Sequence, residues 1–122
     1  MVGGDGVSVV SNVMLSVTGY DIPTADQFVA WIGTECPRGH APEVRGGVGT
    51  LAHITGPDNR WGGDKFPECD VYAGALNHAD LGALLERFGS TPWRVPAAVQ
   101  LLVMDQEQMF FRLWMIRDGR VH

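Results

Sequence analysis

The sequence predicts a small two-layer α+β domain, with helices on one face of an antiparallel sheet. Short runs with apolar residues at every second position are typical of strands, and two longer runs with apolar residues three or four apart are typical of helices. The chain has 122 residues, which suits one domain. We expect a flexible N-terminus over 1–8 and a single α+β domain over 9–122.

Residues 9–18 are rich in valine and alternate, so they are predicted to form the first strand. Thr24 begins the first predicted helix, with Gln27 completing a capping box, and Pro37 ends it. The apolar face of that helix would consist of Ala25, Phe28, Val29, Ile32 and Cys36.

The middle of the chain is expected to contain a loop over 38–47, a strand over 48–55, a long loop over 58–69 and a strand over 70–76. The second predicted helix begins at an Asn77 cap with Asp80 in its first turn, and Gly89 suits its C′ position. Its apolar stripe is Leu81, Leu84, Leu85 and Phe88.

Two final strands are predicted over 98–104 and 110–117, joined by a hairpin loop at 105–108. The order is therefore β-α-β-β-α-β-β. Its first six elements match the ferredoxin-like, split β-α-β arrangement, and the last strand extends the sheet as a C-terminal hairpin. Right-handed crossovers would place both helices on one face.

The formal net charge is −5. This charge argues against nucleic acid or an anionic membrane as a partner, and it favours a basic one. The chain begins without the basic and apolar regions of a signal peptide, and no apolar run approaches the ~20 residues that span a bilayer. Two cysteines are too few for a disulfide scaffold, so we expect a cytoplasmic protein with reduced thiols.

The sheet face that should meet water is not polar. We assign to the core face Val13, Leu15, Val17, Ala73, Ala75, Val99, Leu101, Val103, Phe111, Leu113 and Met115. The other face then holds Gln100, Leu102, Met104, Phe110, Arg112, Trp114, Ile116, Tyr72, Leu76 and either His53 or Ile54. Such a patch is larger than a monomer usually exposes. A second copy, another protein, a small ligand or the chain's own loop at 58–70 would cover it.

Metal chemistry is not expected. Cys36 and His40 lie four residues apart and Cys69 and His78 nine apart, without the paired spacing of a zinc site. We expect no metal and no cofactor.

Catalytic residues are not assigned either. Glu68 and Asp70 flank Cys69, and their charges would raise the pKa of the thiol and oppose a nucleophilic role. His53 would need a carboxylate such as Asp70 within hydrogen-bond reach to act as a base.

The loop at 58–70 combines acidic residues with aromatic ones, which suits a grip on a basic protein. An Ω-like loop packed on its own core is the structural alternative.

The leading hypothesis is a non-catalytic, acidic protein-binding module, an inhibitor or immunity-type protein that binds a protein partner or itself as a homodimer. The expected binding residues are Trp61, Lys65, Phe66, Glu68, Asp70, Tyr72, Met104, Phe110, Arg112 and Trp114. The first alternative is a dimeric α+β barrel-type enzyme or ligand binder, with His53, Tyr72, Arg112 and Trp114 lining a pocket on the open face. The second is a structural subunit of a larger assembly.

Overall fold

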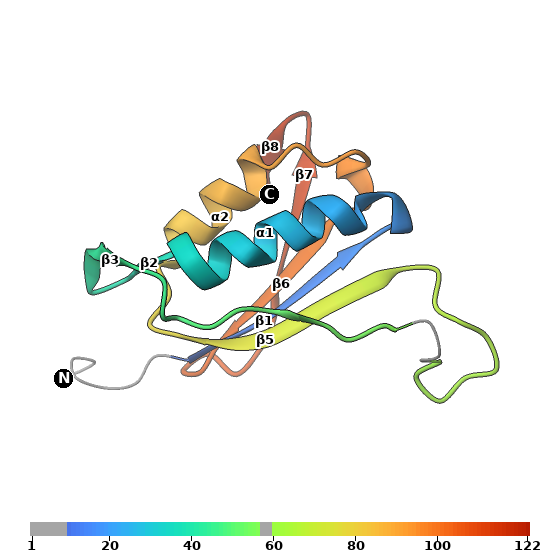
Figure 1. Ribbon diagram of the computed structural model, residues 1–122, viewed down its shortest axis with the longest axis horizontal. Coiled ribbons are helices and arrows are strands. Elements are labelled where there is room, and N and C mark those ends of the chain that lie inside the picture. The colour runs from blue at the N-terminus through green and yellow to red at the C-terminus, as the bar shows by residue number, and fades with distance from the viewer. Residues whose placement is uncertain (1–9, 57–59) are drawn as a thin grey trace.

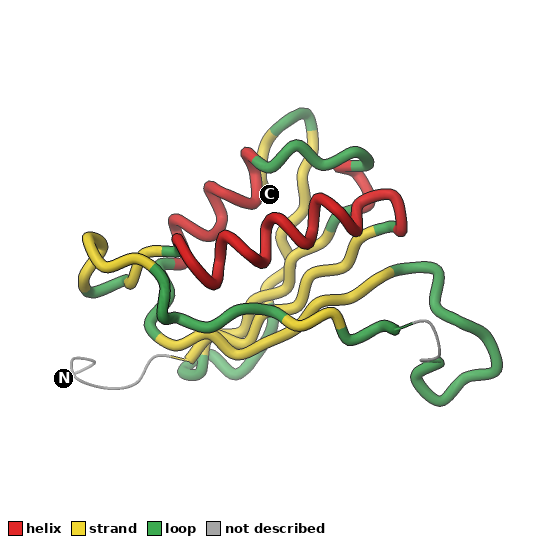
Figure 2. The backbone as a smooth tube through the Cα atoms, viewed as in Figure 1, coloured by secondary structure: helices red, strands yellow, loops and turns green. Residues whose placement is uncertain are grey.

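The computed structural model describes residues 10–56 and 60–122. It confirms the predicted α+β class with two helices and an antiparallel sheet. The large sheet has six strands where five were predicted, and a separate two-stranded sheet was not predicted. Helices α1 (Ile22–Glu35) and α2 (Leu81–Ser90) lie on the same side of the large sheet (Figures 1 and 2). The segment 1–8, expected to be flexible, lies outside the described residues.

The large sheet has the order β4-β5-β1-β6-β7-β8, and all its neighbouring strands are antiparallel. Its strands are β1 (Val10–Val17), β4 (Ala52–His53), β5 (Asp70–Asn77), β6 (Gln100–Asp105), β7 (Arg112–Arg117) and β8 (Arg120–Val121). The two-stranded sheet pairs β2 (Pro37–Arg38) with β3 (Ala41–Arg45), and two single 3₁₀ turns are η1 (Gly19–Asp21) and η2 (Pro96–Ala98).

Two predictions for the middle of the chain were wrong. The expected loop at 38–47 contains the β2–β3 hairpin, which the Gly46 amide anchors by donating to the Cys36 carbonyl at 3.0 Å. The expected strand at 48–55 pairs as β4 only over Ala52–His53. Val48 and Leu51 are buried in the core, and the Thr50–Leu51 backbone bends over the helix side of β5 at Gly74. The segment still runs beside β5, because the Asn77 amide donates to the Val48 carbonyl and the Ile54 amide to the Val71 carbonyl, both at 2.9 Å.

The helix starts also differ from the predicted caps. Helix α1 begins at Ile22, two residues before Thr24, after the N-cap Asp21. Asp21 is buried, and its carboxylate accepts hydrogen bonds from the amides of Arg94 and Val95 at 2.7 and 2.9 Å, so it joins the start of α1 to the loop before β6.

The second helix begins later than predicted. Asn77 ends β5, and Asp80 is the N-cap of α2, with its carboxylate accepting from the Ala83 amide at 3.1 Å. Gly89 lies inside the last turn, because the Thr91 amide still donates to the Arg87 carbonyl. The C-cap is Thr91, so the helix ends three residues later than a Gly89 at C′ predicts.

The core fills the space between the helices and one sheet face. The rings of Phe28, Phe88 and Trp93 meet at centroid distances of 5.7 to 6.3 Å, and the Trp93 indole donates to the Phe88 carbonyl at 2.9 Å. Beneath them the sheet contributes buried side chains from four strands: Val13, Leu15, Val17, Tyr72, Leu76, Val99, Leu101, Val103 and Ile116.

The strand register corrects the predicted faces of two strands. Leu15 lies opposite both Tyr72 and Leu101, and Leu101 lies opposite Trp114. Opposed residues share a face, so the predicted faces of β5 and β7 were reversed. The helix side holds Tyr72, Leu76, Arg112, Trp114 and Ile116, and the opposite side holds Ala73, Ala75, Leu113 and Met115. Both faces of these strands are apolar, so the alternation alone could not say which face was buried.

Candidate interaction surface and the His53 groove

A row of five apolar side chains crosses the sheet on the side away from the helices. The register aligns Ala52, Ala73, Met14, Leu102 and Leu113, one from each of β4, β5, β1, β6 and β7. We call these five residues the central row. Period-two geometry points all five side chains to the same face.

Two further rows flank the central row on that face. One contains Ala75, Asn12 and Met104, and the other contains Val71, Ser16, Gln100 and Met115. These twelve residues in three rows are the open face. None of them carries an ionisable side chain.

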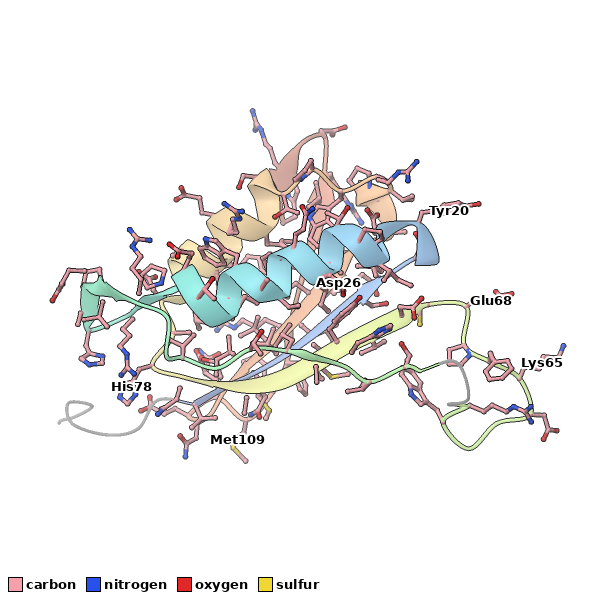
Figure 3. All side chains as sticks on the ribbon, in the orientation of Figure 1. Tyr20, Asp26, Lys65, Glu68, His78 and Met109 are labelled. Carbon is pink, nitrogen blue, oxygen red and sulfur yellow. The ribbon has the colours of Figure 1, made fainter. Side chains whose placement is uncertain are left out.

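Within the part of the chain that the structure describes, no segment lies across the open face (Figure 1). Leu113 is 51% exposed, Met14, Leu102, Met104 and Met115 are half-buried, and Val71 at one end of the open face is 5% exposed. The loop between β6 and β7 adds three exposed side chains, Met109, Phe110 and Phe111. Met109, 75% exposed, lies on the side away from the helices (Figure 3). The open face is therefore an apolar surface that Met109 extends.

A polar cluster lies near the other edge of the sheet, on the helix side. The His53 Nε2 atom is 2.9 Å from the Asp70 Oδ1 atom, and the Thr55 hydroxyl donates to the same Oδ1 at 3.2 Å. The Val71 amide donates to the Thr55 hydroxyl oxygen at 3.0 Å. The carboxylate expected for His53 is thus in reach, and β5 supplies it.

The ring of Tyr72 packs against the ring of His53. The two rings stack with centroids 4.5 Å apart and an angle of 14° between their planes. The Tyr72 hydroxyl donates to Asp26 on α1 at 2.9 Å. Burial raises the pKa of Tyr72, and so does its hydrogen bond to the Asp26 carboxylate, so this phenol is a hydrogen-bond donor over the physiological pH range.

An open groove of about 370 Å³ adjoins this cluster. It is lined by Ile22, His53, Thr55, Gly56, Phe66, Pro67, Cys69 and Asp70. An imidazole held by a carboxylate beside a groove has the geometry of a general base or of a ligand-orienting group. His53 therefore stays a candidate site residue.

The loop at 60–69 extends past the end of β5 (Figures 1 and 3). Trp61 and Phe66 are 51% and 49% exposed, and the Arg60 guanidinium lies 4.9 Å from the centre of the Phe66 ring. Lys65 and Glu68 are exposed on the same loop. The loop leaves the central row uncovered, and its aromatic side chains keep half of their surface in solvent. The Asp58 end of the predicted loop lies outside the described residues.

The structure separates the residues that were expected to form one pocket. Tyr72 is only 1% exposed and lies with His53 at the β4–β5 edge. Arg112 and Trp114 instead line a hollow of about 130 Å³ beside α2, with β1 and β6 between them and the His53 groove. The proposed pocket of four residues on the open face is therefore corrected to two separate places on the helix side.

Of the predicted binding residues, Met104 belongs to the open face, whereas the Phe110 ring lies 5.6 Å from the guanidinium of Arg112, a helix-side residue. Sequence reasoning placed Leu113 and Met115 in the core, although they share the face of Met104. The alternation along β7 does indicate that Leu113 and Met115 share one face and that Trp114 and Ile116 share the other. What was missing was the register that distinguishes the faces.

Among residues 10–56 and 60–122, no group of three or more His, Cys, Asp or Glu side chains is placed to hold a metal ion. Cys36 and Cys69 are both free thiols, and no helix in these ranges is long and apolar enough to cross a membrane. Comparison of the chain with protein-family models, with curated proteins and with solved structures finds no match.

Proposed function

We propose that this protein is a non-catalytic protein-binding module whose docking surface is the open face. The observation that carries the proposal is the open face itself, twelve side chains without an ionisable group on a sheet side that no described segment covers. A large apolar side chain that becomes fully buried contributes ~1.5–3 kcal/mol. Met14, Leu102, Met104, Leu113 and Met115 therefore provide a strong driving force for association.

Within this class, an inhibitor or immunity-type protein is the form that the charge supports. The net charge of −5 favours encounter with a basic partner, because charges around an apolar patch steer association. Trp61 and Phe66 supply exposed aromatic anchors on the projecting loop. We propose a cytoplasmic location, consistent with two free thiols.

For the fold we propose the ferredoxin-like arrangement. The order β4-β5-β1-β6 places β5 between β1 and β4, the two strands of the large sheet that α1 separates in the chain, as split β-α-β units do. Strands β7 and β8 would then be additions to its edge.

Site-specific photo-cross-linking in the native cell tests the docking surface. A photoreactive residue at Leu113 should form a covalent adduct with another polypeptide, and one at Tyr20 should not. Tyr20 is a matched control because it is 71% exposed and lies on the helix side (Figure 3). If neither position yields an adduct, the open face is not a docking surface.

A role for the His53 groove in binding a small ligand is the second candidate, and the 2.9 Å contact between His53 and Asp70 favours it. In an α+β barrel-type enzyme or ligand binder this groove would be the polar site. Amide NMR spectra recorded with small amines and carboxylates test it. The second candidate predicts saturable shifts at His53, Thr55 and Asp70. These shifts should disappear in His53→Ala and remain in the control Glu43→Ala. Unchanged spectra of the wild type would exclude these two ligand classes.

The third candidate, a structural subunit of a larger assembly, differs in the size of the complex. It predicts a native particle much heavier than a protein pair on a sizing column.

A further inference from the structure

We infer that the occupant of the open face is a second copy of this chain, packed sheet against sheet about a two-fold axis. The inference rests on the proposed function, because it names the partner of the same surface. It is carried by the charge, the register and the extent of that face.

The charge distribution of the open face suits self-association. Two copies that each carry a net charge of −5 repel one another, so a homodimer requires an interface from which charged groups are absent. The three rows meet this condition, and the nearest ionisable residue along β7, Arg117, follows Met115 at the rim. A basic partner of the inhibitor type would find the acidic groups that attract it outside these rows, so its charge contacts would lie around the open face and not on it.

The register places the central row where a two-fold axis would bring it against its own copy. In an isologous interface one patch meets its own copy. With the axis either along β1 or across it, the central row of one copy lies on the central row of the other. Met14, on the middle strand of that row, would pack against the partner's central row, and two sheets pack face to face about 10 Å apart.

The extent of the open face is near the lower limit for a dimer. Twelve positions, each ~4.8 Å across the strands and ~6.8 Å along them, give a footprint of about 400 Å². The exposed Met109 side chain on the same side adds to this footprint, which stays below the roughly 800 Å² that each partner buries in a standard interface. We therefore expect a reversible dimer with a dissociation constant on the order of micromolar.

Light scattering coupled to size-exclusion chromatography tests the inference on the full chain over a range of concentrations. The wild type should have twice the chain mass of 13.3 kDa at high concentration. Leu113→Glu and Met14→Glu should each raise the dissociation constant of the dimer on the order of 100-fold or more. A two-fold interface contains each substituted residue twice, so two new carboxylates enter it. Tyr20→Glu, which adds the same charge on the helix side, should remain a dimer.

Leu113 is half-exposed in the single chain, so its substitution does not disturb the core, and circular dichroism verifies this. A wild type that stays at the chain mass at millimolar concentration overturns self-pairing. The photo-cross-linking at Leu113 would then still decide whether another protein docks there. A dimer that persists in both Leu113→Glu and Met14→Glu overturns this interface, since the copies would meet elsewhere.

Discussion

Gly74 is the residue with the least freedom to change. It lies on β5 facing the helices, where the Thr50 carbonyl oxygen approaches so closely that a β-carbon would collide with it. The Leu51 Cα atom would lie at 3.3 Å from the same β-carbon. The inward bend that buries Val48 and Leu51 is possible only because this position lacks a side chain.

Gly74→Ala should therefore lower the free energy of unfolding by about 1–3 kcal/mol, the usual cost of overpacking a core. Urea denaturation followed by circular dichroism measures this change. Gly56→Ala is the matched control, because a β-carbon there meets nothing within 4 Å, and it should change stability by less than ~0.5 kcal/mol. Equal stability of both variants would mean that the 48–51 segment does not pack on β5.

Tyr72 should make the stability depend on pH in the alkaline range. Burial and the Asp26 carboxylate raise the pKa of Tyr72 in the folded chain, whereas an unfolded tyrosine titrates near about 10. Below pH ~10 both states keep the proton. Above it the unfolded chain loses the proton first, so the folded state becomes less stable as the pH rises, by up to ~1.4 kcal/mol per pH unit.

Denaturation curves between pH 8 and 11 should show this loss in the wild type and a shallower slope in Tyr72→Phe. The comparison concerns slopes, because the substitution also removes a hydrogen bond. Equal slopes of stability against pH in the wild type and Tyr72→Phe would contradict a Tyr72 phenol that keeps its proton in the folded chain.

At the scale of the elements, the long strands and both helices could be predicted, because each shows its period over six or more residues. The short elements could not. Strands β2 and β4 have two residues each, too few to show any alternation. The short pairing of β4 follows from the tertiary contact between Thr50 and Gly74, which no local pattern contains.

The faces of β5 and β7 were also beyond sequence reasoning, for a different reason. In β7 the residues Leu113 and Met115 alternate with Trp114 and Ile116, so both faces look suited to a core. Only pairing with β6, whose Leu101 opposes Trp114, decides between them. The prediction of an apolar uncovered face was correct in kind but assigned several of its residues to the wrong side.

The N-cap of α2 provides a test at this scale. The Asp80 carboxylate accepts a hydrogen bond from the Ala83 amide, which has no partner within the helix. Asp80→Ala should lower the free energy of unfolding by ~1 kcal/mol, whereas Asp80→Asn, which keeps an acceptor, should cost less. Thermal denaturation of the three proteins measures the order. A destabilisation of Asp80→Asn as large as that of Asp80→Ala would show that the charge of Asp80, rather than capping, matters.

At the scale of the whole molecule, helices on only one side leave the large sheet half-covered. A chain of this size can bury one core, and here that core uses the helix side. In the self-paired form that we propose, the second apolar side would gain its burial from association, which would link the stability of the chain to its concentration.

The unfolding temperature should therefore rise with protein concentration. Unfolding of a dimer to two chains becomes less favourable by ~1.4 kcal/mol for each tenfold increase, or about 0.7 kcal/mol per chain. For a domain of this size that corresponds to a rise of roughly 3 °C per tenfold. Calorimetry over two decades of concentration measures the trend. Leu113→Glu should remove it, because a separated chain unfolds independently of its neighbours, and Tyr20→Glu should retain it. An unfolding temperature of the wild type that does not change with concentration would show that the open face contributes nothing to stability through self-pairing.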